Sequence, residues 1–510
     1  MTPRIWLLAD QLSAAYPINI VIPEPGKYLK LLRLLINVFA SFPVGAVTMQ
    51  KEIFKMKKHR LFVTLTAIAA SVFVLGACGS TTKSIPDDSS TAQESSVTTS
   101  STESVNLTPT MTPTPFPTID DPEEVLPDGV YRNYLTGAYV TKEESLVRPI
   151  SMMIDNSEPA IPQSGISKAD VYYESIIESS VSRMCLVFNN LDGLYRIGPL
   201  RSCRDNFLSM VSGFDSIYEH YGQAAYALPY LEDDRCDNVS GLGSYTNQVF
   251  FRDNTFHVMP HNAYTSEVGM ETGIKTLGYR TEHDETYRGP FRYVLEGEKT
   301  DMTDAVDANV VVPGYPVNNP RFLYDEATGL YKREQFGAPH IDTENGEQIQ
   351  VKNIIFEYEN SAFYQDSPYL HFQTEAQGYG LYISEGKAIP VYWERPEFFA
   401  QVKYYTMDGH RLKMNQGKTF VCVIENKKIQ AAKIGKDDKS LKCVVSEDKV
   451  KEANAINEQW EKEYKENEHW YLTACSDLRL ENIAKHNGKS KVCYIYDTEY
   501  EYGNAGKKGK

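Results

Sequence analysis

The sequence lacks the short motifs that mark the common catalytic centres. Its 510 residues contain no Gly-x-Ser-x-Gly elbow, no His-Glu-x-x-His pair, no Walker loop and no EF-hand loop. No Cys-x-x-Cys pair occurs, so the usual spacing of a zinc site is missing. We therefore expect no cofactor and no metal ion. The lack of an activated nucleophile favours binding over catalysis.

The apolar run at residues 61–75 is too short to cross a membrane. It has 15 residues, against the roughly 20 that a bilayer requires. A basic cluster at residues 56–60 precedes it, and Gly76, Ala77 and Cys78 follow it. This order is typical of a bacterial signal peptide that ends in a lipobox, where the small pair is the cleavage site and the cysteine receives a diacylglycerol.

We therefore expect a lipoprotein signal peptide at residues 56–77 and a lipid on Cys78. The protein would be anchored to the cell membrane on its extracytoplasmic face. A signal of 77 residues would be far longer than the usual 15–30 or so. Residues 1–55 are therefore interpreted as an over-extended start.

Positive charge is scarce from Cys78 onward. This part has 43 basic and 65 acidic residues, a formal net charge of −22. Phosphate backbones would be repelled, so no nucleic-acid partner is expected, and flat binding to anionic lipid is disfavoured. Half of residues 79–118 are Ser or Thr, and such a segment cannot offset its folding entropy. We interpret residues 78–127 as the lipidated cysteine and a disordered tether.

Seven cysteines remain once Cys78 is lipidated, so at least one cannot pair within the chain. The last four, Cys422, Cys443, Cys475 and Cys493, would form two disulfides in an oxidising exterior and stay thiols in a reducing one.

Hydrophobic patterning divides the rest of the chain into three regions. Residues 128–315 contain buried-type strands and helices, the last helix ending at Gly278. Residues 316–426 alternate apolar and polar side chains around tight turns, which predicts a β-meander. Residues 427–510 hold 16 Lys and one Arg, with an amphipathic helix that begins at Ser446.

These regions predict an α+β fold. A mixed-sheet α/β N-terminal domain is followed by a smaller antiparallel β-rich domain. The expected strands of the first domain include residues 150–155, 171–178 and 184–188, and the expected hairpin turns of the second lie at Glu385-Gly386 and Asp408-Gly409.

The type of cation points to a candidate site in the first domain. Between residues 171 and 298 there are nine Arg and one Lys, and Arg201 and Arg204 stand where a helix is expected to begin. The guanidinium fork suits carboxylate or phosphate, and a helix start favours an anion. The alternative is that these arginines clamp neighbouring Asp and Glu. The candidate ligand-binding residues are Asp155, Asn156, Gln163, Ser164, Arg183, Arg201, Ser202, Arg204, Arg252, His261 and Asn262.

Three histidines are candidates for acid–base chemistry. His220, His257 and His261 would each need an orienting carboxylate, for which Asp155 and Asp170 are available. The alternative for His261 is a loop histidine bonded to backbone groups.

Four segments of the first domain resemble the YerB-like lipoprotein family of bacterial surface proteins. They are residues 153–156, 162–170, 197–204 and 259–265, and the resemblance extends over about residues 145 to 425. The resemblance implies a mixed α/β N-terminal domain joined to a smaller β-rich domain, on a lipid-anchored chain. It implies no activity. The chain departs from the family pattern at residues 221–224.

Three functions are compatible with the sequence. The first is an envelope protein that binds an anionic or glycan ligand. The second is an envelope enzyme that acts on a phosphorylated or wall-derived substrate with His261 as acid–base. The third is a structural interaction module.

Overall fold

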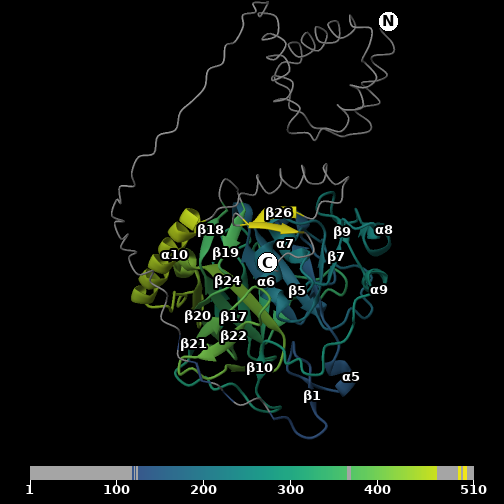
Figure 1. Ribbon diagram of the computed structural model, residues 1–510. Helices are drawn as coiled ribbons and strands as arrows, with labels where there is room; N and C mark the ends of the chain where they lie inside the picture. The colour runs from purple at the N-terminus through teal and green to yellow at the C-terminus, as the bar shows by residue number, and fades with distance from the viewer. Residues whose placement is uncertain are drawn as a thin grey trace, which may run out of the picture. The chain divides into compact units, whose positions relative to one another are not determined.

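The computed structural model describes residues 116, 118–119, 121, 125–364, 369–467, 492–495 and 498–501 (Figure 1). All of them fall in one compact unit, residues 107–510. The predicted signal peptide, Cys78 and most of the predicted tether lie outside the described residues. No helix within the described ranges is both long and apolar enough to span a bilayer.

One mixed sheet of eleven strands organises the fold. Its five middle strands are buried along nearly their whole length, as expected for strands covered on both faces. In sheet order they are β17 (Asn353–Glu359), β24 (Thr419–Glu425), β4 (Val171–Ile176), β5 (Ser182–Phe188) and β3 (Ile150–Asp155).

Shorter or more exposed strands complete both sides of the sheet. Beyond β3 lie β6 (Ile217–His220) and β7 (Asn238–Ser240). Beyond β17 lie β20 (Gln377–Ser384), β21 (Lys387–Glu394) and β11 (Val306–Asp307), with β22 (Lys403–Thr406) also paired to β21.

The strand β24 joins the two predicted domains. It runs parallel to β17 of the second region and to β4 of the first, with Thr419 opposite both Asn353 and Val171. The chain therefore departs from a simple meander after residue 415. Gly417 has φ +138°, a conformation open mainly to glycine, and the chain crosses there to the middle of the sheet.

The hairpin at Glu385-Gly386 is confirmed. Both residues have positive φ, at 54° and 72°, as a two-residue type I′ turn requires. The turn at Asp408-Gly409 is confirmed too, since Tyr405 and Arg411 pair across it. The predicted α+β class therefore agrees with the structure.

A second sheet of six strands takes four strands from the second region, one from the end of the first and one from the start of the third. Its members are β12 (Val310–Val312), β13 (Arg321–Asp325), β14 (Leu330–Gln335), β15 (Ala338–Pro339), β16 (Gln350–Val351) and β25 (Lys433–Gly435). The two-stranded pairs are β1 (Tyr131–Arg132) with β2 (Tyr139–Val140), β8 (Phe251–Arg252) with β9 (Ala263–Tyr264), β10 (Arg292–Tyr293) with β23 (Lys413–Met414), β18 (Ser361–Phe363) with β19 (Leu370–Phe372), and β26 (Val492–Ile495) with β27 (Thr498–Glu501).

Helices of the first region flank the central sheet. The helix α6 (Asp205–Ser212) begins after Arg204, which provides no side-chain cap because guanidinium has no acceptor. The helix α9 (Glu267–Leu277) is capped by Ser266 and ends at Gly278 in the left-handed conformation, as predicted. Shorter helices are α5 (Lys142–Ser145), α7 (Leu228–Leu231) and α8 (Thr246–Val249).

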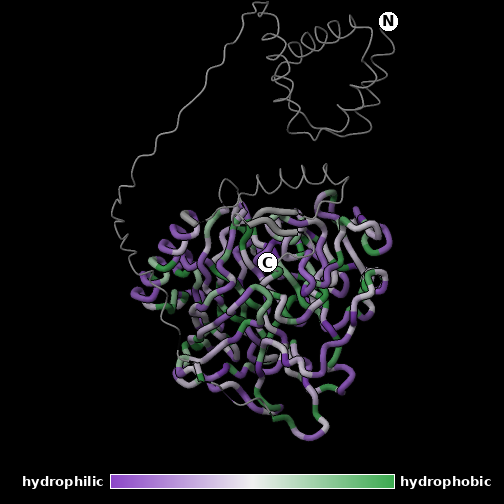
Figure 2. Tube along the Cα trace, viewed as in Figure 1, coloured by the Kyte–Doolittle hydropathy of each residue, from purple (hydrophilic) through white to green (hydrophobic). Residues whose placement is uncertain are grey.

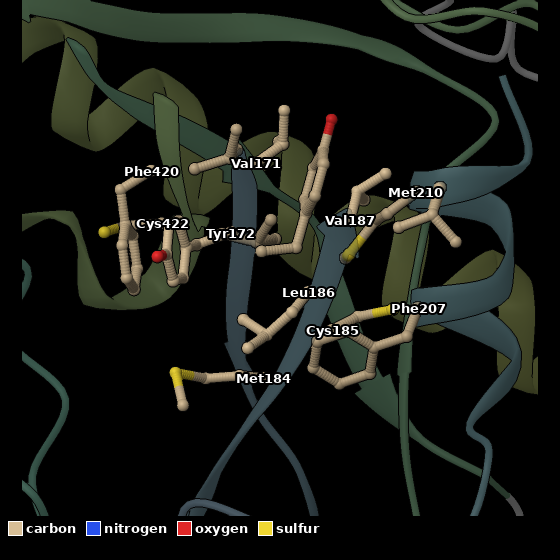
Figure 3. Close-up of a cluster of buried hydrophobic side chains, with 14 of the residues drawn as sticks. Val171, Tyr172, Met184, Cys185, Leu186, Val187, Phe207, Met210, Phe420 and Cys422 are labelled. Carbon is tan, nitrogen blue, oxygen red and sulfur yellow. The ribbon is translucent and has the colours of Figure 1, made fainter. Parts of the chain in front are cut away.

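The hydrophobic core lies around β4 and β5. Figure 3 shows their side chains between Phe420 and Cys422 of β24 and Phe207 and Met210 of α6. The rings of Tyr172 and Phe420 stack at 5.3 Å. Full burial of one large apolar side chain contributes about 1.5–3 kcal/mol. Apolar segments follow these central strands in Figure 2, whereas α10 is mainly hydrophilic.

The helix α10 (Glu447–Asn467) begins just after Ser446, as predicted. The Ser446 hydroxyl accepts a hydrogen bond from the N–H of Lys449, and Val450 and Ala453 are buried. The helix lies beside β18, and α9 lies beside β7 on the opposite flank of the sheet (Figure 1).

The end of the predicted tether packs on the second region. Phe116 stacks on Tyr392 at 3.8 Å, and Asp121 accepts hydrogen bonds from His410 and from the N–H of Arg411. The tether as predicted, residues 78–127, therefore includes contacts of the folded body at its end. The ring of Phe116 and the contact between Asp121 and His410 hold this part of the tether to the folded body, although the sequence around them is polar.

The described cysteines carry free thiols. They are Cys185, Cys203, Cys236, Cys422 and Cys443. Two of the four cysteines considered for disulfides, Cys422 and Cys443, are thus thiols here. The side chains of Cys475 and Cys493 lie outside the described residues.

Candidate functional site

The segment 197–204 brings distant parts of the first region together. This segment is not a strand of any sheet, so its backbone N–H and carbonyl groups form hydrogen bonds with other segments. The N–H of Leu200 donates to the carbonyl of Ala263 (2.7 Å), and the N–H of Arg201 donates to that of Met153 (2.8 Å). The end of β3 and the start of β9 therefore meet at Arg201.

Asp155, the last residue of β3, is the centre of this meeting point. Arg201 Nε lies 2.6 Å from its Oδ2, and His261 Nδ1 lies 2.8 Å from the same oxygen. Ser157 donates to Oδ1 from its N–H and its hydroxyl. Burial opposes ionisation of Asp155, but Arg201 and these hydrogen bonds outweigh it and lower the pKa of the carboxyl.

Arg183 lies opposite Asp155 in the β3–β5 register, and it is buried. Its Nη1 donates to the carbonyl of Ser202 (2.8 Å), but its buried Nε has no hydrogen-bond partner among the described residues. Burial, and then the neighbouring charge of Arg204, lower the pKa of this guanidinium to about 9. No carboxylate of the described chain forms an ion pair with it within 4.0 Å.

Arg204, in contrast, is matched. It forms an ion pair with Glu178, donates to the carbonyl of Cys203 and lies over the ring of Tyr369 at 4.9 Å. Burial opposes ionisation of Glu178, but Arg204 outweighs it, so the pKa of that carboxyl is lowered.

We call Arg183, Arg201, Arg204, Asp155, Glu178 and His261 the arginine cluster. It holds three guanidinium groups and two carboxylates, so one cation is in excess. Arg201 and Arg204 act as clamps, which was the alternative expectation for them. An anion site therefore depends on Arg183.

Three predicted site residues use their polar groups inside the protein. Asn156 donates to Glu174 (2.8 Å), Gln163 donates to the carbonyl of Asp155 (2.6 Å), and the Ser164 hydroxyl lies 2.7 Å from that of Thr343. All three are fully buried. Asn156 also accepts from Gln335 (3.0 Å), and the Gln163 oxygen contacts His340. All three side chains therefore bridge to the second region, and Gln163 also holds the backbone of Asp155.

Arg252 and Asn262 form a separate pair. Arg252 Nη1 donates to Asn262 Oδ1 (2.7 Å), and the guanidinium lies 4.8 Å from the centre of the Tyr221 ring. The pair closes the β8–β9 hairpin. Ser202 contributes its carbonyl to Arg183, while its hydroxyl donates to the carbonyl of Tyr221.

Of the three histidines, His261 is joined to a carboxylate. His220 is buried, both its ring nitrogens contact neighbouring oxygens, and burial lowers its pKa. His257 Nε2 lies 2.7 Å from the carbonyl of Pro162. Asp170 accepts from the N–H of Asn189 instead of orienting a histidine. The side chain of His261 is 18% exposed.

Sequence patterns gave no indication of a buried ion pair between the regions. Arg333 of β14 and Glu174 of β4 lie 2.7 Å apart with no exposed surface. Arg333 also contacts His340, whose pKa is lowered well below its ordinary value by burial and then by that guanidinium. The partners are 159 residues apart, so local spacing carries no signal of the pair.

A cavity of about 290 Å³ was also not predicted. It lies where α6 and β6 meet residues 399–401 of the second region, and it contains no member of the arginine cluster. Its walls are Leu208, Val211, Ser212, Gly213, Asp215, Ser216, Tyr218, Arg235, Cys236, Tyr287, Phe399 and Gln401. Within the described residues, no group of three or more His, Cys, Asp or Glu side chains is placed to hold a metal ion.

These observations define an α+β protein in which two regions share one mixed sheet and an arginine-rich site lies at the ends of β3 and β5. The chain belongs to the YerB-like family. The model described as "Protein of unknown function (DUF3048) N-terminal domain" matches residues 135–280, and the model of the C-terminal domain matches residues 310–421. Together they cover about half of the chain.

Relatives from one organism agree with this assignment. The chain is 29% identical over 310 residues to "Putative lipoprotein YerB" of Bacillus subtilis (strain 168), covering 60% of this chain and 88% of the relative. The crystal structure of YerB protein from Bacillus subtilis superposes with a TM-score of 0.50 at 26% identity, covering 58% of this chain and 96% of that one. The helix α10 lies beyond the matched C-terminal domain.

Proposed function

We propose that this protein is a lipoprotein of the cell envelope that binds an anionic ligand at the arginine cluster. A lipid on Cys78 would hold it on the extracytoplasmic face of the cell membrane. The lipobox at residues 74–78 supports the anchor, as does the similarity to a relative named a lipoprotein. Phosphate groups and the carboxylates of acidic glycans are the candidate anions.

The observation that carries this proposal is the unmatched guanidinium of Arg183. A buried charge without a partner is costly, because it has lost its water and gained no counter-charge. A phosphate or carboxylate beside Arg183 would supply that counter-charge and accept a hydrogen bond from Nε. The side chain of Arg201 is 23% exposed, so it lies on the solvent side of the cluster and would contact the same anion.

Arg183→Met tests the proposal. Inorganic phosphate or glucuronate at 100 times its dissociation constant should stabilise the parent by about 2.7 kcal/mol, seen as a higher thermal midpoint. Arg183→Met should lose this effect and be at least as stable as the parent without ligand, because it removes an unmatched charge. Arg235→Ala is the control, because it removes a guanidinium that lies outside the cluster and, unlike Arg183, is paired with an aspartate. A parent that no anion stabilises, or an equal response in Arg183→Met, would contradict the site.

The anchor is tested separately. Cys78→Ala should abolish lipidation, which mass spectrometry of the N-terminus of the membrane-extracted protein reveals. An unmodified N-terminus upstream of Cys78 in the parent would contradict the anchor.

A second candidate function follows from the contact between His261 and Asp155. A carboxylate that holds Nδ1 leaves Nε2 to exchange a proton, which is the arrangement of a general acid–base. An envelope enzyme of this kind would act on a phosphorylated or wall-derived substrate. Hydrolysis of p-nitrophenyl phosphate by the parent, lost in His261→Gln with anion binding retained, would favour it. If the parent does not hydrolyse this phosphate ester, the result contradicts the phosphate-hydrolysing enzyme, and the binding proposal stands.

A further inference from the structure

An exposed apolar turn lies directly against the arginine cluster. The N–H of His261 donates to the carbonyl of Val258 (2.9 Å), which closes the turn 258–261. The carbonyl of Pro260 lies 3.5 Å from Arg201 Nη1. The turn thus contacts the cluster at two of its four residues, Pro260 and His261.

The other two side chains of the turn point into solvent. Val258 is 72% exposed and Met259 is 69% exposed, and Phe256 just before them is 46% exposed. Tight turns at a protein surface are usually built from Gly, Asn, Asp, Ser and Pro. Single exposed apolar residues are common on protein surfaces and need no explanation. Val258 and Met259 instead form an adjacent apolar pair at the edge of a charged site, where such surface is often used for binding.

The fold gains little from these two side chains. They are far more exposed than the core residues, and the turn is closed by backbone atoms and held to Arg201 through a carbonyl. Replacing them with polar residues would therefore preserve the turn. Their apolar surface is available to a ligand held by the neighbouring cations.

We infer that the anion bound at the arginine cluster carries a hydrocarbon chain, which lies along Val258 and Met259. This inference rests on the proposed anion binding and narrows its ligand class to alkyl phosphates. Arg183 and Arg201 hold the phosphate, and the turn contacts the methylenes of the chain on one side. Apolar contact and charge pairing then act on one molecule.

A series of alkyl phosphates tests the inference. The probes are inorganic, methyl, butyl and hexyl phosphate, titrated calorimetrically into the full chain carrying Cys78→Ala, so that no attached lipid competes. A fully buried methylene lowers the dissociation constant about fourfold, and contact on one side about twofold. Hexyl phosphate should therefore bind about thirtyfold tighter than methyl phosphate.

The variant Val258→Ser/Met259→Ser should lose this dependence on chain length. Its affinity for inorganic phosphate should remain that of the parent, which also shows that the cluster is intact. Val268→Ser is the matched control, because Val268 is 68% exposed on α9, and it should keep the thirtyfold gain.

The failures are distinguishable. If all phosphates bind the parent equally, the hydrocarbon inference is overturned and the anion site stands. If no phosphate binds, the hydrocarbon inference is overturned, and the proposed function fails with it when glucuronate does not bind either. A gain that persists in the double variant places the chain elsewhere, for example in the 290 Å³ cavity, and also overturns the inference.

Discussion

At the scale of single residues, the buried ionisable groups fall into matched and unmatched sets. Glu174 is matched by Arg333, and Arg395 is shared between Glu357 (3.2 Å) and Glu359 (3.6 Å). With one cation for two carboxylates, burial and then Glu357 raise the pKa of Glu359 well above its usual value. A buried ionisable group with a counter-charge stays ionised and is costly to disrupt. A buried group without one has a shifted pKa that favours its neutral form, or it takes its counter-charge from a ligand.

Breaking the Glu174–Arg333 pair should strongly lower the free energy of unfolding. Arg333→Met leaves a buried carboxylate without its cation, so we expect a loss of about 3–5 kcal/mol in the free energy of unfolding. Chemical denaturation measures it. Arg321→Met on the neighbouring strand β13 removes an ion pair with Asp438, an exposed residue, and should cost about 1 kcal/mol or less. Equal costs for the two variants would contradict the structural role of the buried pair.

Glu219 predicts a dependence of stability on pH. It is fully buried, neither oxygen has a partner among the described residues, and burial raises its pKa well above 4.5. The folded state therefore keeps a proton that the unfolded state releases above about pH 4.5. Stability is full below that pH and falls as pH rises, by about 1.4 kcal/mol per unit until the folded pKa is reached.

Glu219→Gln should remove this loss. The difference in unfolding free energy between variant and parent, followed by denaturation from pH 4 to 8, should grow with pH in favour of the variant. Glu458→Gln, at an exposed position of α10, should follow the parent throughout. A constant difference between Glu219→Gln and parent would show that Glu219 ionises normally.

At the scale of elements, a buried polar side chain helps to join α10 to the second region. The buried Asn457 accepts from the N–H of Ser361 (2.8 Å) and donates to its carbonyl (3.3 Å), so it pairs with the backbone of β18. Val450 and Ala453 add the apolar part of the contact. The helix thus extends the folded body beyond the matched family domains.

Asn457→Ala should therefore cost about 1–3 kcal/mol, because the N–H of Ser361 loses its partner and the carbonyl keeps only Lys427. Denaturant unfolding measures the loss. Glu458→Ala, one residue further on the exposed side of the helix, should change stability by less than about 0.5 kcal/mol. If both variants unfold alike, α10 does not depend on this contact.

At the scale of the whole molecule, the sequence indicates a lipid anchor, a polar tether and a folded body. The body begins earlier than the tether's composition indicates, because Phe116 and Asp121 contact the second region. The two family domains are joined through the parallel ladder between β24 and β4. A cut in the tether should leave them together.

Limited proteolysis should release a stable fragment that begins close to Phe116. Proteases are expected to cut in the Ser/Thr-rich residues before it, which mass spectrometry of the fragment locates. Phe116→Ala removes the stacking on Tyr392 and should move the new N-terminus toward residues 125–128. A parent fragment that begins near Asp128 or later would contradict the contact.

Features that depend on neighbours in the sequence were predicted well. The strand at residues 150–155, the serine cap and glycine end of α9, and the Glu385-Gly386 turn each follow from a few adjacent residues. Family membership follows from several such segments together. The lipobox and the polar tether are also local patterns, and they stay predictions.

Tertiary structure decided which charges have partners. Asp155 meets His261 across 106 residues, and Glu174 meets Arg333 across 159, so no spacing rule relates them. The sequence favoured Arg201 and Arg204 as the anion site because of their place at an expected helix start, and Arg183 was one further candidate. Only the fold matches two of them with carboxylates and buries Arg183 without one, because ion pairing acts through space over a few ångströms and not along the chain.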